Sequence, residues 1–154
     1  AYSYFPYIHS MHFEPDTIYH IYNRGNRQQT IFFNRENYIY FLEKVRKYIA
    51  PCSDILCWCL MPNHFHFLVH TNEHSCSVIS KSVIPTQIPT ENIRLLLSSY
   101  TKGIQKQEHF SGNLFQQKTK AKPVTALNGG YALTAFNYIH QNPYNAKLVK
   151  KMED

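Results

Sequence analysis

Residues 54–70 read DILCWCLMPNHFHFLVH, and this stretch decides the fold. It contains two largely apolar runs, 54–60 and 63–70, each of the length of a β-strand. Pro62 lies in the short break between them, and proline interrupts strands and marks turns. The stretch therefore predicts an antiparallel β-hairpin.

A histidine pair stands out in the second run. His64 and His66 are two residues apart, so they project from the same face of a strand, whereas Phe65, Phe67 and Val69 face the opposite way. Imidazole is the commonest transition-metal ligand in proteins, and two imidazoles leave coordination positions open. The pair is a candidate metal half-site, although two histidines on a strand are also found as surface or interface residues.

The sequence on either side of the hairpin predicts the rest of a small α+β domain. In chain order the predicted elements are a strand at 18–22, a helix capped by Asn34 and stopped by Pro51, the hairpin, a helix from Glu91 capped by Thr90, a strand at 113–118, and a helix at 130–141 ended by Asn142-Pro143. This order predicts a ferredoxin-like split βαβ fold, an antiparallel sheet with two helices on one face. The last helix is then free to cover the other face.

The length of 154 residues suits one domain rather than two. Residues 1–16 show neither a helical nor a strand period and are expected to form an irregular N-terminal arm. Residues 17–154 are expected to form the single domain. Within it, residues 72–89 lack any period and predict a long loop.

The composition favours a nucleic-acid partner. Sixteen Lys and Arg residues against ten Asp and Glu residues give a formal charge of +6, which attracts a polyanion. The aromatic share is 15%, and aromatic rings between basic residues can stack on unpaired bases. Most of these rings are nevertheless expected to lie in the core.

The cysteines and the apolar runs indicate a cytoplasmic protein. The four cysteines form no CxxC pair, and Cys57 and Cys59 fall in the first run of the hairpin, where cysteine acts as a small hydrophobe. No apolar run approaches the length of a membrane span, and the first residues do not show the charged and apolar pattern of a signal sequence.

The last predicted helix carries a second candidate pair. Tyr138 and Asn142 are four residues apart, so they share a helix face and a phenol and a carboxamide can approach one ion. Periodicity alone favours a core role for Tyr138 beside Phe136 and Ile139. Asn142 alone reads as a helix-terminating residue before proline.

Three blocks of the sequence resemble the REP-associated tyrosine transposases, bacterial relatives of the single-tyrosine HUH transposases. They are YHIYNRGNR at 19–27, MPNHFHFLV at 61–69 and YIHQNP at 138–143, and the resemblance spans roughly residues 17–149. One block departs from the family: residues 115–120 read FQQKTK, where relatives usually carry an aromatic-Gln-x-Arg-Phe stretch. The basic character of that block is kept without its arginine.

The resemblance implies a metal-dependent transposase that cleaves and rejoins single-stranded or hairpin DNA. The nucleophile falls on Tyr138, which would form a 5′-phosphotyrosine, and the metal ligands fall on His64, His66 and Asn142, with magnesium or manganese as the expected ion. A domain of this kind acts as a monomer or a homodimer. We expect DNA contacts from the basic residues Arg24, Arg27, Lys102, Lys118, Lys120 and Lys122.

Three other readings of the sequence remain open. The main alternative is a non-catalytic single-stranded nucleic-acid-binding protein, because ferredoxin-like sheets with aromatic and basic residues also bind RNA. Against it, no RNA-recognition signature lies on a predicted strand. A histidine-based metal hydrolase acting through water would be preferred if cleavage survived without the Tyr138 hydroxyl. A structural zinc protein is disfavoured because no closed set of four ligands is visible.

Overall fold

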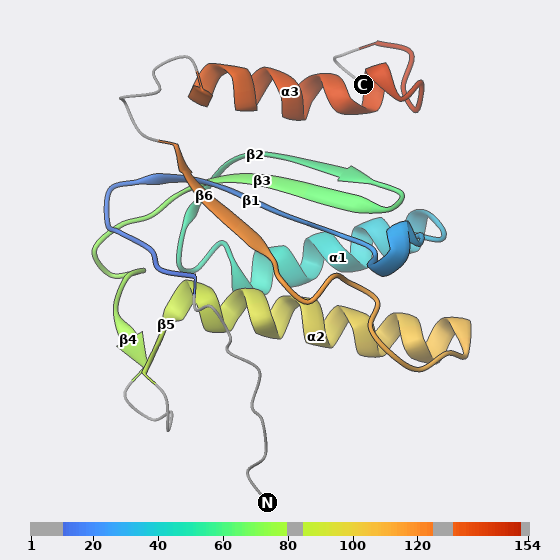
Figure 1. Ribbon diagram of the computed structural model, residues 1–154, viewed down its shortest axis with the longest axis horizontal. Helices are drawn as coiled ribbons and strands as arrows, with labels where there is room; N and C mark the ends of the chain where they lie inside the picture. Colours follow the sequence, from blue (N-terminus) through green and yellow to red (C-terminus); the bar gives the residue numbers. More distant parts are fainter. Residues whose placement is uncertain (1–10, 80–84, 125–130, 152–154) are drawn as a thin grey trace, which may run out of the picture.

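The computed structural model describes residues 11–79, 85–124 and 131–151, in which a four-stranded sheet is flanked by helices on both faces (Figure 1). The elements in chain order are β1 (Ile18–Arg24), the short 3-10 helix η1 (Asn26–Gln28), α1 (Arg35–Tyr48), β2 (Asp54–Met61), β3 (His64–His70), β4 (Val78–Ile79), β5 (Thr86–Gln87), α2 (Ile88–Glu108), β6 (Lys120–Val124) and α3 (Tyr131–Asn145).

The four long strands form an antiparallel sheet in the order β2-β3-β1-β6. This is the strand order that a split βαβ arrangement produces, because β3 lies between β2 and β1 while β6 adds to the free side of β1. The ferredoxin-like fold expected from the sequence is therefore confirmed. The predicted hairpin forms, but its turn is at Pro62 and Asn63, one residue later than the expected break at Met61 and Pro62, because Met61 belongs to β2.

The main core lies between the sheet and helices α1 and α2. Phe65, Phe67 and Val69 of β3 are buried there, facing away from the histidines as the two-residue period required. Phe41 of α1 packs its ring edge-on against Tyr100 of α2, with 4.9 Å between ring centroids. Edge-to-face aromatic contacts of this kind help to hold the two helices against each other beneath the sheet.

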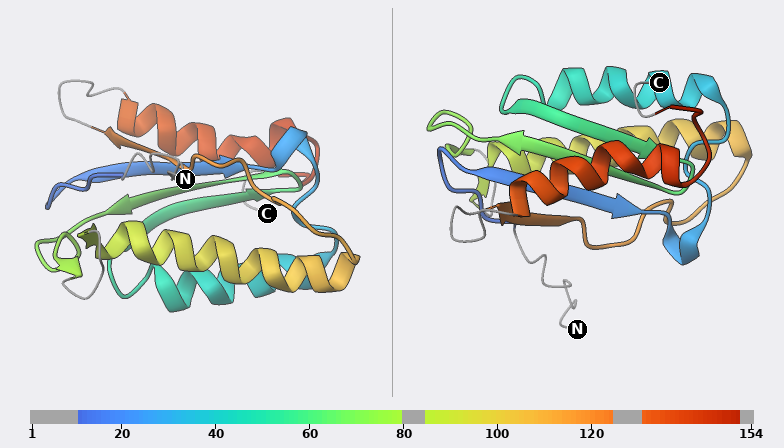
Figure 2. Two further views of the ribbon diagram at one scale, coloured as in Figure 1. Left: turned by 60° about the horizontal axis from the view of Figure 1, so that its bottom comes forward. Right: turned by 90° about the horizontal axis from the view of Figure 1, so that it is seen from above.

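Helix α3 covers the opposite face of the sheet (Figure 2). Ala135 and Ile139 of α3 are buried against a second apolar cluster, to which β2 and β3 contribute Cys57, Cys59 and Leu68. The cysteines thus act as small apolar residues, as predicted. Helices α1 and α2 leave this face of the sheet open, and α3 partly closes it. The last helix was expected at this position.

Helix α1 follows the sequence prediction closely. The Asn34 side chain accepts a hydrogen bond from the backbone N–H of Asn37, 3.0 Å away, which caps the helix. Phe41 and Val45 form its buried stripe. The helix ends at Tyr48, three residues before Pro51.

The predicted strand at 113–118 is wrong. Leu114 and Phe115 are both buried, and adjacent buried residues break the alternation of a half-buried strand. Asn23 donates hydrogen bonds to Gln116 O and Thr119 Oγ1, which hold this segment in an irregular path beside β1. The fourth strand forms later, as β6 (Lys120–Val124); its Pro123 is tolerated because β6 is an edge strand.

The boundaries of α2 and the preceding loop also differ from the prediction. The helix begins at Ile88 with Gln87 as N-cap, and a proline in its first turn suits that position. Thr90, the predicted cap, instead donates its hydroxyl to Met11 O. The predicted loop at 72–89 contains the short antiparallel pair β4 and β5.

Helix α3 runs through the proline that was predicted to end it. Proline removes one backbone donor, yet Ala146 N still donates to Asn142 O and Leu148 N to Pro143 O, so the chain keeps turning. Asn142 is consequently inside the helix. The predicted start at residue 130 lies outside the described residues.

Two further expectations concern the ends and the membrane. Residues 1–10 of the predicted arm lie outside the described residues; residues 11–16 form no helix or strand, and Phe13 among them is buried in the main core. Among the described residues, no helix combines the length and apolarity that crossing a membrane requires.

Candidate active site

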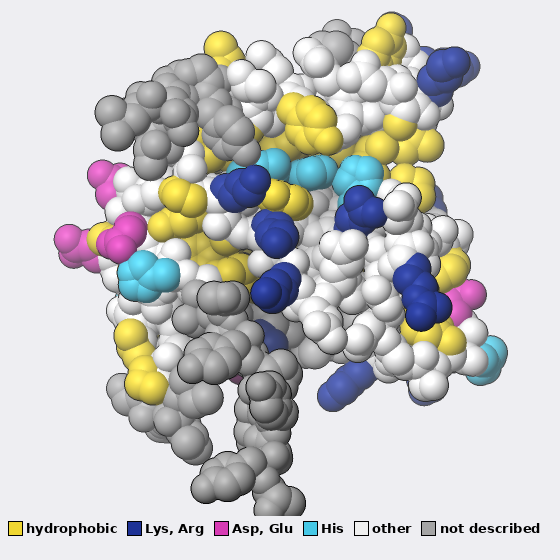
Figure 3. Space-filling view, in the orientation of Figure 1, with side chains coloured by type: hydrophobic (Ala, Val, Ile, Leu, Met, Phe, Trp, Pro, Cys, Tyr) yellow, Lys and Arg dark blue, Asp and Glu magenta, His cyan; other side chains and the backbone are white. Residues whose placement is uncertain are grey.

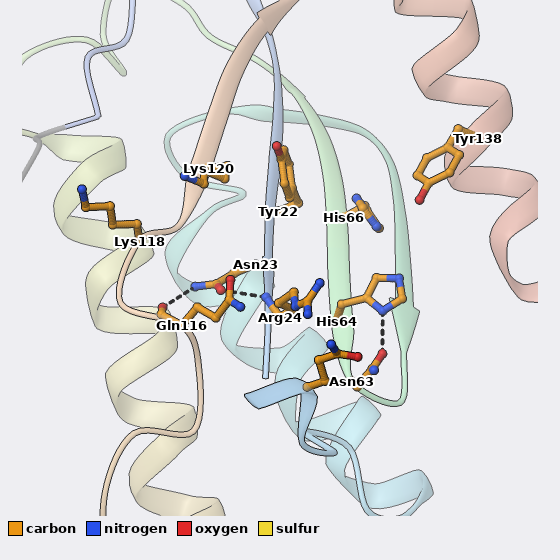
Figure 4. Close-up of a pocket in the computed structure, with 11 residues that line it drawn as sticks. Tyr22, Asn23, Arg24, Asn63, His64, His66, Gln116, Lys118, Lys120 and Tyr138 are labelled. Carbon is orange, nitrogen blue, oxygen red and sulfur yellow. Dashed lines mark hydrogen bonds between the residues drawn. The ribbon is translucent and has the colours of Figure 1, made fainter. Parts of the chain in front are cut away.

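An open pocket with a volume of about 390 Å³ lies between α3 and the sheet (Figure 4). Side chains from β1, η1, the hairpin turn, β3, the segment before β6, the start of β6, and α3 line it. The lining residues are Tyr22, Asn23, Arg24, Gln28, Asn63, His64, His66, Gln116, Lys118, Lys120 and Tyr138. Six of the ten residues predicted for metal, catalysis or DNA are in this set.

The register of the strands explains why distant residues meet. Tyr22 of β1 is paired with His66 of β3 on one side and with Lys120 of β6 on the other, and Arg24 is paired with His64. Side chains of paired residues point to the same face of an antiparallel sheet. The histidines, an aromatic ring and the basic side chains therefore share the face that α3 covers.

His64 presents one ring nitrogen to the pocket. Its Nδ1 lies 2.7 Å from the Oδ1 of Asn63, and because an amide oxygen only accepts, Nδ1 carries the proton. The lone pair of the neutral ring is then on Nε2. Burial and the nearby Arg24 lower the pKa of His64, so the ring is neutral at neutral pH.

His66 is deeper in the structure. Only 7% of the residue is exposed, and burial, with smaller contributions from His20 and His64, lowers its pKa to about 3. Its Nδ1 lies 2.9 Å from the Nε2 of His20. Its Nε2 is buried without a hydrogen-bond partner among the described residues, which is costly unless a ligand or water reaches it.

Tyr138 projects from α3 toward the histidine pair (Figure 4). The ring is edge-on to that of His66, with 5.5 Å between centroids and 89° between the planes. Half of the residue is exposed, whereas the next residue, Ile139, is fully buried. The core role that periodicity favours for Tyr138 is therefore wrong, because Ile139 and Ala135 supply the buried side of the helix.

Asn142 does not line the pocket but lies one helical turn beyond Tyr138, partly buried. Its Nδ2 atom is buried without a hydrogen-bond partner among the described residues. A rotation of the carboxamide exchanges Nδ2 and Oδ1, which would put a metal-binding oxygen at that unpaired position.

The donors present fit a divalent ion with open coordination positions. Nε2 of the neutral His66 ring has no hydrogen-bond partner among the described residues, and the His64 ring lies beside it, with 5.1 Å between the ring centroids. In the part of the chain that the structure describes, no group of three or more His, Cys, Asp or Glu side chains is arranged to hold a metal. No closed four-ligand site is therefore found among these residues, and an ion in the pocket would rely on the imidazoles of His64 and His66.

Five of the six predicted DNA-binding residues lie in or near the pocket. Arg24, Lys118 and Lys120 line the pocket, and Lys122 lies over the Tyr22 ring at 5.9 Å from its centroid. Figure 3 shows histidine side chains in a row beneath α3 with Lys and Arg side chains next to them. Arg27 is exposed in η1, next in sequence to the pocket residue Gln28.

Lys102, the sixth predicted DNA-binding residue, lies away from the pocket. It is exposed on α2, whose buried stripe packs against the opposite face of the sheet. The prediction that it lies around the open face is wrong, because the helix period places residue 102 away from that stripe and α2 lies on the other side of the sheet from α3.

Several pocket residues were missed by sequence reasoning. Asn23 and Asn63 organise the rim through hydrogen bonds, and Tyr22 forms a wall beside His66. His20 and Tyr22 are two residues apart on β1, so their side chains share one face of the sheet, and this spacing is visible in the sequence. That signal points to the pocket only once the pairing of β1 with β3 is known.

Neither the protein-family models nor the curated proteins include a match to this chain. Among solved structures, a REP-associated tyrosine transposase bound to a REP hairpin matches with a TM-score of 0.60. The two chains are 13% identical, and the match covers 94% of this chain and 76% of the other. At this low sequence identity, the match shows that the two chains share a fold and nothing further. The chain has the fold of a REP-associated tyrosine transposase.

Proposed function

We propose that this protein is a metal-dependent single-stranded DNA endonuclease and strand transferase, a transposase that acts through a 5′-phosphotyrosine intermediate. The observation that carries the proposal is the meeting of Tyr138 with His64 and His66 in one open pocket. A half-exposed tyrosine beside two neutral imidazoles is suited to attack a phosphate group held between them.

The substrate is proposed to be single-stranded or hairpin DNA. Arg24, Lys118 and Lys120 surround the pocket with positive charge, which favours binding of a phosphate backbone. The similar transposase is bound to a REP hairpin, which supports a hairpin substrate for this chain too. The pocket is also flanked by Tyr22, on which an unpaired base could stack.

In the proposed reaction, the Tyr138 hydroxyl oxygen attacks the phosphorus of a DNA phosphodiester. A bond forms between that oxygen and phosphorus, and the bond from phosphorus to the 3′-oxygen of the preceding nucleotide breaks. The phenolic proton passes to water, and the departing oxygen takes up a proton to become a free 3′-hydroxyl. The DNA 5′ end stays on Tyr138, and a second 3′-hydroxyl can reverse the step and join new strands.

His64, His66 and Asn142 would hold the divalent ion, magnesium or manganese. A bound ion would polarise the scissile phosphate and stabilise its developing charge. The protein's own contribution is position: α3 holds the phenol over the sheet, and Asn63 orients the His64 ring.

The test is to incubate the protein with 3′-end-labelled single-stranded hairpin DNA and manganese and to resolve the products on a denaturing gel. A protein-linked DNA band that requires manganese and disappears with chelator is the expected result. Metal-dependent cleavage without any covalent band would indicate a hydrolase acting through water. Binding without cleavage would indicate the non-catalytic nucleic-acid binder.

A further inference from the structure

A third histidine lies behind the proposed metal site. His20 of β1 is 6% exposed, and its Nε2 is 2.9 Å from the Nδ1 of His66. The two rings are stacked, with 5.1 Å between centroids and 27° between the planes. The contact joins two buried side chains on neighbouring strands.

The shared hydrogen bond has two proton arrangements. A hydrogen bond between two imidazole rings needs one nitrogen that donates and one that accepts, and here both rings are buried. In one arrangement His66 donates from Nδ1 to Nε2 of His20, which leaves a lone pair on Nε2 of His66. In the other His20 donates, and Nε2 of His66 carries the proton and is unable to bind a metal.

Two buried ring nitrogens lack a hydrogen-bond partner among the described residues, and an ion would satisfy only one of them. They are Nε2 of His66 and Nδ1 of His20. An ion on Nε2 of His66 satisfies the first atom and requires a proton on Nδ1, for which His20 is the acceptor. Nε2 of His20 is engaged by His66, and no group of three or more His, Cys, Asp or Glu side chains in the described part of the chain is arranged to hold a metal, so we treat His20 as a partner of His66 and not as a ligand.

We infer that His20 is a positioning residue, which holds His66 in the orientation and tautomer that a divalent ion requires by accepting the Nδ1 proton of His66. This inference rests on the proposed function. Metal-binding histidines commonly donate their second ring N–H to a carboxylate or carbonyl. Here an imidazole fills that role on the same sheet face, as Asn63 does for His64.

The test compares three full-length proteins by calorimetric titration with manganese: the unmodified chain, His20→Leu and His20→Gln. Leucine fills the space without an acceptor, whereas glutamine places an amide oxygen near the position of Nε2. We expect His20→Leu to bind manganese about 10- to 100-fold more weakly, the loss typical of a missing outer partner, and His20→Gln to bind nearly as well as the unmodified chain.

Equal affinity in the unmodified chain and His20→Leu would overturn the inference and leave the proposed function standing. Equal weakening by leucine and glutamine would reduce His20 to a packing role and overturn it as well. An unmodified chain that binds no manganese would instead remove the metal site and with it the proposed function.

A second measurement needs no substitution. In the unmodified chain loaded with zinc, nitrogen-15 NMR should find His66 bound through Nε2, with a slowly exchanging proton on Nδ1. A zinc-bound Nδ1, or a proton on Nε2, would contradict the inference even if the leucine variant failed to fold.

Discussion

The ring of Tyr138 meets the ring of His66 edge to face, at 5.5 Å between centroids, although 72 positions separate the two residues in the chain. The contact joins the only helix on its face of the sheet, within the described residues, to a central strand. Ile139, next to Tyr138, anchors the helix in the apolar cluster below. The position of the phenol is therefore fixed by packing rather than by a flexible loop.

The first prediction concerns metal binding by the histidine pair. His64→Ala and His66→Ala should each weaken manganese binding by at least about tenfold in calorimetric titration, because each removes one of two imidazole ligands. His70→Ala is the matched control: it lies on the same strand, where its ring bonds Asp16 outside the pocket, and it should leave the affinity unchanged. Undiminished binding in both site variants would show that the ion, if any, binds elsewhere.

The second prediction concerns electrostatic binding of DNA. Lys118→Ala and Lys120→Ala should each reduce affinity for single-stranded DNA and lower the slope of log affinity against log salt by about 0.7, the value for one lost phosphate contact on a single strand. Lys102→Ala removes the same charge from the opposite side of the sheet and is the matched control. Fluorescence anisotropy over a range of salt concentrations measures both quantities.

A Lys102 variant that lowered the slope as much as Lys118→Ala would contradict the prediction that DNA contacts only the pocket side of the sheet. DNA would then extend around the domain to α2, and the pocket would not define the binding face.

Local patterns predicted the elements that are decided by neighbouring residues. The cap at Asn34, the turn at Pro62 and the alternation from His64 to Val69 are short-range signals, and each appears in the structure as expected. Periodicity alone favoured the core for Tyr138, whereas the resemblance singled it out, and the structure places it at the pocket. The remaining features depend on which strands pair and on which face of the sheet each helix lies.

The wrong predictions have a common physical cause: contacts between residues far apart in the sequence outweigh the local pattern. Residues 113–118 have strand-like composition, but side-chain bonds from Asn23 and burial of Leu114 with Phe115 determine their path. The contact of His20 with His66 depends on strand register, and Lys102 was misplaced because a helix face is visible in sequence while the side of the sheet it covers is not.

The third prediction is a pH dependence of stability from two buried thiols. Burial raises the pKa of Cys57 and of Cys59 from 9.0 to about 11. Because the folded pKa exceeds the unfolded one, the thiols' contribution is fully present below pH 9 and is lost as pH rises through 11, at up to about 1.4 kcal/mol per pH unit for each thiol. Urea denaturation between pH 7 and 10.5 measures this loss.

The Cys57→Ala, Cys59→Ala double variant is the control for the other groups that titrate in this range. Its stability should fall less steeply above pH 9 than that of the unmodified chain. Identical slopes would mean that the thiols are not protonated apolar groups in the folded state, and a thiolate metal site would have to be reconsidered.

The last prediction assigns the covalent bond. Among twelve tyrosines, Tyr138 should carry the 5′ end of the cleaved DNA, because its hydroxyl points into the pocket with His64 and His66. Tyr138→Phe removes one oxygen from a half-exposed ring, so the thermal midpoint and the affinity for hairpin DNA should stay close to those of the unmodified chain while the covalent band is lost. Tyr144→Phe, on the same helix but outside the pocket, is the matched control and should retain the band. Mass spectrometry of the adduct then locates the nucleotide, and finding it on Tyr131 or Tyr144, or finding an undiminished covalent band in Tyr138→Phe, would show that another residue is the nucleophile.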